Sequence, residues 1–300
     1  MSKSEAATHL DQNTRRLLNL TDAQRIACID HDLWIGYRLA REAHDRLEQV
    51  LKSERRMRPD NLLIVGASNN GKTAIARRFL ARHTLLEDSE AERATIPVAF
   101  IVAPNGAKTA LFFASILAAL GRAPGRRNTT AQLRDEAYRA MKDVGLRLLL
   151  IDDLHNIRGS GVGSFLVELR NLGSVTGVSL GAFATKEISY VLRQDEQMAN
   201  RFGLMTLPRW NFEDVEYPKL LATFETRLPL WQKSNLTEPS LARDILAKAG
   251  GLIGGIAGVL RQAAAEAIRA GNEKIDRSML VRVNAASPEG IEALAQSPHL

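Results

Sequence analysis

The chain has 300 residues, of which 45% are hydrophobic and 25% charged, and its formal net charge is +6 at pH 7. This length and composition exclude a disordered chain and allow one sizeable α/β core with a smaller second domain, while the positive charge favours a polyanionic partner. No run approaches the roughly 18 apolar residues of a membrane-spanning helix and the polar first residues lack the apolar centre of a signal peptide, so we expect a cytoplasmic protein with no membrane partner.

Residues 1–57 are predicted to form an N-terminal helical segment. Thr21 and Gln24 have the spacing of a capping box, which marks the start of a helix. Cys28 follows in the same stretch and is expected to be a small buried core residue; as the single cysteine, it excludes a disulfide within the chain. A second helix carries an apolar stripe with a four-residue repeat at Leu39, Ala43, Leu47 and Leu51.

Residues 58–210 show a different pattern, in which short apolar runs alternate with amphipathic stretches of helical length. The runs lie at residues 62–65, 98–102, 148–151, 178–183 and 204–207. This alternation predicts an α/β domain with a parallel five-stranded sheet between helices. Residues 211–286 then read as a C-terminal helical lid domain, and residues 287–300 as a polar tail.

The first strand leads into the sequence GASNNGKT at residues 66–73, followed by a helical stretch. GxxxxGK[ST] between a strand and a helix is the pattern of a P-loop, and it predicts ATP and Mg²⁺ as ligands. Backbone amides would face the phosphates, while Lys72 would neutralise the β and γ phosphates and the Thr73 hydroxyl would hold Mg²⁺. The predicted nucleotide-binding residues are Gly66, Ala67, Ser68, Asn69, Asn70, Gly71, Lys72, Thr73 and Ala74.

A second acidic strand end follows in LRLLLIDDLHNI. Asp152 is predicted to complete the Mg²⁺ site as the Walker B carboxylate. Asp153 stands where most AAA+ enzymes place a glutamate that activates water; its side chain is one methylene shorter, so we expect slow hydrolysis. Alternatively, Asp153 is a helix-capping or salt-bridging carboxylate. His155 has no partner at metal-ligand spacing and is expected to form a hydrogen bond near the site.

Two further positions match AAA+ elements. Thr185 follows the fourth predicted strand, where these proteins keep the residue that orients the hydrolytic water. Arg201, in MANRF, directly precedes the fifth strand, the place of the arginine finger that reaches the γ-phosphate held by a neighbouring subunit. Arg193 is the reserve candidate, and the alternative for Arg201 is a surface or interdomain salt bridge.

Longer segments resemble the TniB family, transposon ATPases related to TnsC and more distantly to MuB. The resemblance covers roughly residues 20–275 and rests on RPDNLLIVGASNNGKT, LLLIDDLHNI, DEQMANRF, LPRWNFEDVEYPKLLATFETRLPLWQKSNL and GGLIGGIAGVLRQAAAEAI. It implies an AAA+ fold that binds double-stranded DNA when loaded with ATP and assembles around it as a ring or helical filament. The implied partners are further copies of the chain, an RNase-H-like transposase and a TniQ-type targeting protein.

The sequence departs from the AAA+ pattern at Asp153 and in the lid. Gly254 and Gly255 stand where many AAA+ proteins carry a sensor arginine, and Arg261 lies nearly two helical turns further on. The lid therefore leaves open whether Arg261 substitutes for that arginine.

Two loops have the basic or polar residues that a DNA backbone requires. Lys108 and Thr109, in the loop after the second strand, are the preferred DNA contacts. Arg126 and Arg127 belong to a second loop, which is either a DNA contact or a solvated surface loop.

The leading interpretation is an ATP-switched, DNA-binding transposition helper that hydrolyses ATP. A helicase loader would carry the same core motifs, and a non-hydrolysing scaffold locked by ATP would follow if Asp153 were inert. A small-molecule kinase is disfavoured, because its mobile acceptor lid with catalytic arginines is replaced here by the Arg201 segment and a C-terminal helical domain.

Overall fold

Residues 39–208 and the remaining residues form separate structural units. The computed structural model describes residues 7–30, 34–84, 95–123, 125, 128–192 and 195–283. One unit comprises Leu39–Pro208, and the other combines Met1–Arg38 with Arg209–Leu300. No helix in these described ranges is long and apolar enough to cross a membrane.

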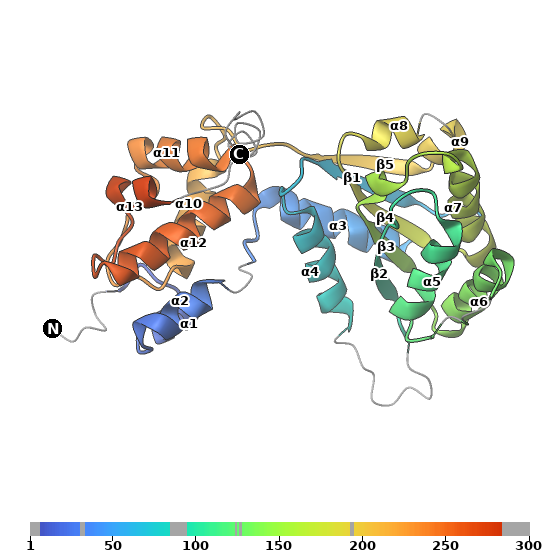
Figure 1. Ribbon diagram of the computed structural model, residues 1–300, viewed down its shortest axis with the longest axis horizontal. Helices are drawn as coiled ribbons and strands as arrows, with labels where there is room; N and C mark the ends of the chain where they lie inside the picture. Colours follow the sequence, from blue (N-terminus) through green and yellow to red (C-terminus); the bar gives the residue numbers. More distant parts are fainter. Residues whose placement is uncertain are drawn as a thin grey trace, which may run out of the picture. The chain divides into compact units, whose positions relative to one another are not determined.

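Five parallel strands form the sheet of the first unit (Figure 1). They are β1 (Asn61–Gly66), β2 (Val98–Val102), β3 (Leu148–Asp152), β4 (Ser179–Ala184) and β5 (Phe202–Leu207). Their order is β2-β3-β4-β1-β5, and all neighbouring pairs are parallel. The predicted five-stranded parallel sheet is confirmed, with small differences at the strand ends. The carboxyl ends of β1, β3 and β4 meet at one edge, where ligands bind in open α/β sheets.

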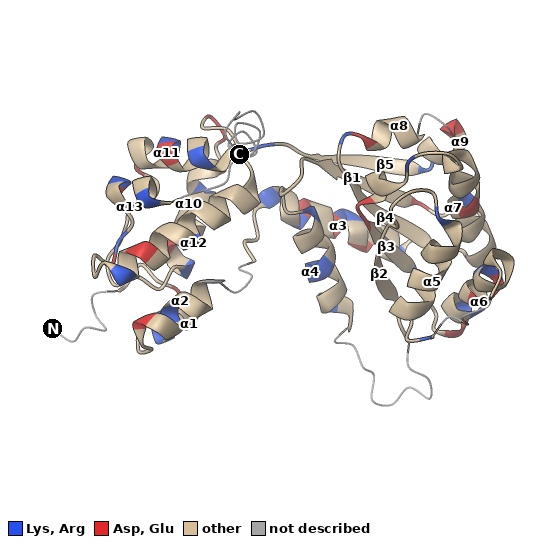
Figure 2. Ribbon diagram, viewed as in Figure 1, with Lys and Arg blue, Asp and Glu red and all other residues tan. Residues whose placement is uncertain are grey.

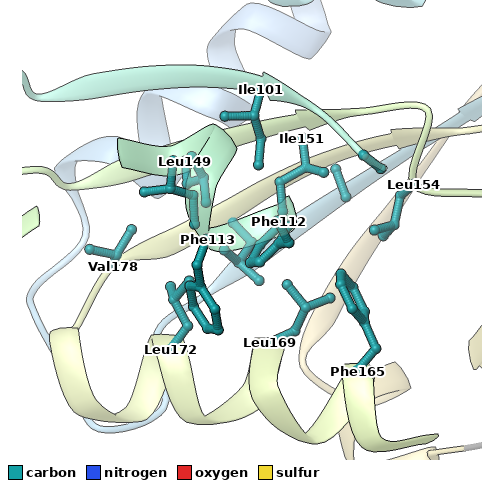
Figure 3. Packing of buried hydrophobic residues seen from close by; sticks show 14 of the residues in the cluster. Ile101, Phe112, Phe113, Leu149, Ile151, Leu154, Phe165, Leu169, Leu172 and Val178 are labelled. Atoms are coloured by element: carbon teal, nitrogen blue, oxygen red, sulfur yellow. The ribbon is translucent and has the colours of Figure 1, made fainter. Parts of the chain in front are cut away.

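Helices cover both faces of this sheet. They are α3 (Arg38–Lys52), α4 (Lys72–Thr84), α5 (Thr109–Ala119), α6 (Thr130–Asp143), α7 (Val162–Thr176), α8 (Ile188–Leu192) and α9 (Glu196–Ala199), with a 3₁₀ turn η2 (Leu154–Asn156). On one face, α5, α6 and α7 share an apolar cluster with the strands. Figure 3 shows Phe165, Leu169 and Leu172 of α7 pointing toward α5 and the strands. On the other face, a side chain at Gly181 would lie 2.9 Å from the Leu47 Cδ2 atom of α3.

The second unit is helical. It contains α1 (Gln12–Leu17), α2 (Asp22–Asp30), α10 (Tyr217–Arg227), α11 (Pro239–Ala249), α12 (Ile253–Arg269) and α13 (Arg277–Arg282). The predicted capping box of α2 is confirmed, because Thr21 N donates to Gln24 Oε1 at 3.1 Å and Gln24 N to Thr21 Oγ1 at 3.4 Å. Arg25 is 2% exposed and donates to both carboxylate oxygens of Glu273, at 2.6 and 2.8 Å, so α2 is tied to the chain after α12.

The residues that precede the sheet divide between the two units. Residues up to Arg38 cluster with the C-terminal helices, whereas residues from Leu39 onward belong to the unit with the sheet. Along α3 the expected stripe is buried at Ala43, Leu47 and Leu51, but Leu39 is only half-buried. Cys28 was expected to be buried; it is half-exposed on α2. The predicted tail at 287–300 lies outside the described residues.

Candidate functional site

The loop between β1 and α4 has the backbone of a phosphate cradle. Asn69 and Gly71 adopt positive φ angles of 57° and 82°. At Gly66, a Cβ atom would lie only 3.0 Å from Leu207 Cβ and 3.1 Å from Leu207 O, so β5 leaves no room for a side chain. The loop ends at Lys72, the first residue of α4, and thus presents a helix N-terminus at the sheet edge, a favourable place for phosphate.

Asn70 fixes this loop to the neighbouring strand. Its side chain is 2% exposed, and Nδ2 donates to Leu207 O at 2.9 Å and to Pro208 O at 3.0 Å. The sequence indicated Asn70 as a nucleotide-binding residue, but it gave no sign of this second role. The only available signals for this second role were the polar residue inside the P-loop and the Leu-Pro sequence at the end of β5, far along the chain.

Lys72 lies folded over its own loop. Its Nζ donates to Gly66 O at 3.0 Å and to Ala67 O at 2.7 Å. Burial lowers the pKa of Lys72, and the negative charges of Asp152, Asp153 and Glu187 oppose that shift. Within the described residues, the Lys72 ammonium group is held by two carbonyls and by the charges of nearby carboxylates, which suits it to bind an incoming phosphate.

Thr73 and Asp152 meet at the ends of α4 and β3. The Thr73 hydroxyl donates to Asp152 Oδ2 at 2.6 Å, and Asp153 N donates to Asp152 Oδ1 at 3.0 Å. Asp152 is 2% exposed; burial raises its pKa, while the hydrogen bond from Thr73 acts in the opposite direction. A hydroxyl and a carboxylate side by side are the hard oxygen ligands that Mg²⁺ prefers, so these residues fit the ion.

Asp153 has a left-handed backbone, with φ 53° and ψ 38°, directly before η2. Aspartate tolerates this conformation better than most residues. The two alternative roles are not seen: Asp153 makes no side-chain capping bond to η2, and it forms no ion pair within the described ranges. Its carboxylate, half-buried beside Asp152, is not committed to a structural contact.

Thr185 and His155 connect the ends of β4 and β3. Thr185 N donates to His155 Nδ1 at 3.3 Å, which confirms the expectation of a hydrogen-bonding histidine near the site. Two residues after Thr185, Glu187 places a further negative charge that acts on Lys72. Glu187 was not predicted from the sequence. Its position in the loop after β4, next to β1 in the sheet, was the signal that could have found it.

Arg201 lies at the opposite edge of the sheet. Gly66 pairs with Leu207 at the carboxyl edge, whereas Asn61 pairs with Phe202, the residue after Arg201, at the amino edge. The length of β5, at roughly 3.3 Å per residue, therefore separates the Arg201 backbone from the P-loop of its own chain. Arg201 Nη1 donates to Ser174 Oγ at 3.1 Å and to Arg170 O at 3.4 Å. The predicted alternative, a salt bridge, is absent among the described residues. The reserve candidate Arg193 lies outside them.

The first predicted DNA-contact loop lies beside the site. Lys108 is exposed at the N-cap of α5, a helix without charged residues (Figure 2), and Thr109 is its first residue. Gly106 N donates to Asn156 O at 2.9 Å, so this loop is fastened to η2. Arg126 and Arg127 lie outside the described residues.

Packing explains why the lid has glycine at residue 255, where many AAA+ proteins carry a sensor arginine. A Cβ atom at Gly255 would lie 2.5 Å from Ala249 O, so the close approach of the end of α11 excludes any side chain at this position of α12. An arginine cannot stand there. Arg261 is half-buried further along the same helix.

Comparisons with known proteins agree with this fold. The fold is shared by the Aeropyrum pernix ORC2 protein, solved as ADPNP–ADP complexes, at 16% identity and a TM-score of 0.61, over 86% of this chain and 70% of that one. Cdc6p from Pyrobaculum aerophilum is similar at 17% identity and a TM-score of 0.59, over 91% and 74% of the two chains. Domain III of Thermotoga maritima DnaA is similar at 14% identity and a TM-score of 0.52, over 83% and 92%. A search of curated proteins found no match.

These similarities identify the fold as AAA+. A family model described as "Bacterial TniB protein" matches residues 25–212, from α2 through the P-loop and sheet to the start of the lid. Since that match covers more than half of the chain, the protein belongs to the TniB family, a family of transposition ATPases of the AAA+ type.

Proposed function

We propose that this protein is an ATP-dependent, DNA-binding transposition helper that hydrolyses ATP slowly. The observation that carries the proposal is the 2.6 Å hydrogen bond between Thr73 and Asp152, beside a buried Lys72 and an uncommitted Asp153. These groups combine two oxygen ligands, a cation and a potential base at one sheet edge. Membership of the TniB family supports a role for these groups in a transposition ATPase.

In this proposal the backbone amides of residues 66–74 bind the phosphates of ATP. Lys72 leaves its two carbonyl acceptors for the β and γ phosphates, and Thr73 and Asp152 hold Mg²⁺. The ion, when bound, neutralises charge on the phosphate oxygens. Asp153 accepts a proton from the attacking water, and Thr185, held through its backbone by His155, orients that water.

Hydrolysis is slow in this proposal because of Asp153. Its carboxylate is one methylene shorter than the usual glutamate and is carried on a left-handed backbone, which limits the positions it can reach. If Asp153 is inert, the protein is instead a scaffold that ATP locks onto DNA. The position of Asp153 thus supports slow hydrolysis and a non-hydrolysing scaffold equally, and only a measurement of ATP turnover distinguishes the two.

Arg201 acts on the nucleotide of a neighbouring copy. Its place at the amino edge of β5 supports this, because the P-loop of the same chain lies at the other edge. The copies form a ring or a helical filament around double-stranded DNA, with Lys108 and Thr109 next to the DNA backbone. Two similar structures, an Aeropyrum pernix ORC1 protein and Drosophila ORC, were solved with DNA. An RNase-H-like transposase and a TniQ-type protein are the further partners.

The test is phosphate release by the purified protein, measured with and without duplex DNA, together with binding of a fluorescent ATP analogue. We expect binding that requires Mg²⁺ and slow release that DNA changes. Lys72→Ala is expected to abolish nucleotide binding and ATP-dependent DNA binding. ATP-dependent DNA binding that survives in this variant would refute the phosphate site.

A second experiment distinguishes the alternatives. Asp153→Asn abolishes turnover but leaves nucleotide binding intact if Asp153 is the base, whereas unchanged turnover would assign the base elsewhere. A wild-type protein that assembles on DNA with ATP but releases no phosphate is the non-hydrolysing scaffold. Stimulation by a replicative helicase rather than by a transposase would favour a helicase loader.

A further inference from the structure

The α7–α9 face carries a hydrogen-bond network that ends at Arg201. Arg170 of α7 donates from Nη1 to Asp195 Oδ2 at 3.1 Å and to Gln197 Oε1 at 3.0 Å. Both side chains of the Arg170–Asp195 ion pair are largely buried, with 22% and 11% of their surface exposed. A largely buried pair of this kind restrains its elements more strongly than an exposed one.

Asp195 has a second task in the same network. Its Oδ1 accepts from Met198 N at 3.0 Å, so it caps α9, the short helix that leads to Arg201. Arg201 N in turn donates to Met198 O at 3.1 Å. Arg170, through Asp195, therefore fastens to α7 the turn from which the Arg201 side chain emerges.

The Arg201 side chain also leans on α7. Its Nη1 donates to Ser174 Oγ and to Arg170 O, and Ser174 Oγ itself donates to Arg170 O at 3.0 Å. All of these acceptors are neutral. The Arg201 Nε atom is buried and has no hydrogen-bond acceptor in the described part of the chain.

Among the described residues, the Arg201 guanidinium thus pairs with no anion. Burial lowers its pKa, and the positive charges of Arg58 and Arg170 lower it further, with Asp195 as the opposing charge. Because Asp195 is already engaged by Arg170, the patch holds more positive than negative charge. An arginine held in this way gains most from a multiply charged anion, for which its planar fork is suited.

We propose that Arg170 is the positioning residue that holds Arg201 ready for the triphosphate bound by a second copy of this chain. The proposal rests on the trans role of Arg201 given above. Arg170 does not touch the nucleotide itself. It acts by fixing the capped turn of α9 on α7, so that Arg201 reaches the neighbouring phosphates without a search through other rotamers.

The test uses mixed assemblies on duplex DNA, in which each variant acts either as nucleotide holder or as arginine donor. Lys72→Ala subunits hold no nucleotide and do not assemble on DNA by themselves, but beside ATP-bound Arg201→Ala subunits they still donate Arg201. Adding them to Arg201→Ala subunits is therefore expected to restore ATP hydrolysis. Lys72→Ala/Arg170→Met subunits are expected to restore it roughly 10- to 100-fold less well, because a misplaced catalytic group loses up to that factor. Arg170→Met subunits mixed with Lys72→Ala donors are expected to hydrolyse as Arg201→Ala subunits do in the same mixture.

Three controls separate positioning from folding. Arg134→Met removes an arginine that contacts Glu168 of α7 at 3.5 Å but does not belong to the network, and as a donor it is expected to restore hydrolysis fully. Arg170→Lys keeps one donor for Asp195 and is expected to rescue part of the donor activity. The ATP affinity of Arg170→Met is expected to equal that of the wild type, so the loss is in kcat.

The outcomes are distinguishable. If Arg201→Ala leaves hydrolysis unchanged, the proposed trans role itself fails. If Arg201→Ala abolishes hydrolysis but Lys72→Ala/Arg170→Met donors restore it as well as Lys72→Ala donors, the positioning role of Arg170 is refuted. Arg170→Met subunits could also fail to hydrolyse ATP when they hold the nucleotide beside Lys72→Ala donors. That result would mean that Arg170 has a structural role alone, and it would also refute the positioning role.

Discussion

Replacing Asn70 by alanine tests how firmly the P-loop is held. The Asn70 side chain supplies two hydrogen bonds, to Leu207 O and Pro208 O, and its removal leaves Leu207 O without this donor in a buried place. Each bond contributes about 1 kcal/mol, and an unsatisfied buried carbonyl adds about 1–3 kcal/mol. We therefore expect Asn70→Ala to lower the free energy of unfolding of the sheet unit by about 3–5 kcal/mol.

Urea unfolding followed by circular dichroism measures this loss. The chain has 3 tryptophans, Trp34, Trp210 and Trp231, which all belong to the helical unit, so tryptophan fluorescence follows that unit separately. A suitable control is Asn69→Gly, because glycine adopts the positive φ angle of residue 69 and Asn69 is exposed.

Asn70→Asp makes the test sharper. A carboxylate keeps the shape of the side chain but cannot donate, and it places negative charge against two carbonyl oxygens. We expect Asn70→Asp to unfold at least as easily as Asn70→Ala. Two results would refute the view that hydrogen bonds donated by Asn70 hold the loop. One is an Asn70→Asp variant more stable than Asn70→Ala, and the other is an Asn70→Ala variant as stable as the wild type.

Three other changes probe the packing and the ion pairs. Gly181→Ala places a Cβ atom within 2.9 Å of two leucine side chains, and thermal unfolding is expected to show a loss of roughly 1–3 kcal/mol; a neutral result would mean that α3 shifts freely. Arg25→Met leaves Glu273 largely buried without its partner and is expected to cost about 3 kcal/mol by urea unfolding followed by tryptophan fluorescence, with Arg25→Lys less damaging. Burial lowers the pKa of His44 from its ordinary 6.5, as do the charges of two arginines of α4, so its contribution to stability is full above pH 6.5 and lost as the pH falls below it. His44→Gln is expected to reduce this loss of stability at low pH. An equal pH dependence of stability in the variant and the wild type would contradict the assignment of the loss to His44.

The sequence was sufficient for the parts of the site that depend on local pattern. The strand runs, the loop ending in Lys72 and Thr73, and the acidic strand end at Asp152 are each encoded by neighbouring residues. Parallel pairing then brings the ends of β1, β3 and β4 together, as the alternation of strands and helices predicted.

The contacts that escaped prediction join distant residues. Arg25 binds Glu273 and Asn70 binds the end of β5, and no local periodicity marks either pair. The network from Arg170 to Arg201 crosses between two helices in the same way. The burial of Cys28 was predicted wrongly. An amphipathic pattern indicates that a helix is present better than it indicates which residues lie at the border of its buried face.

The strand order also affects how this protein can be made. β1 is among the first parts of the sheet to leave the ribosome, yet both of its neighbours, β4 and β5, are translated much later. Until then, an apolar strand has two unsatisfied edges and depends on its helices, or on a chaperone, for protection from aggregation. Fragments that stop before residue 179 are therefore expected to be insoluble, and shortened expression clones of this ATPase domain need to extend through β5.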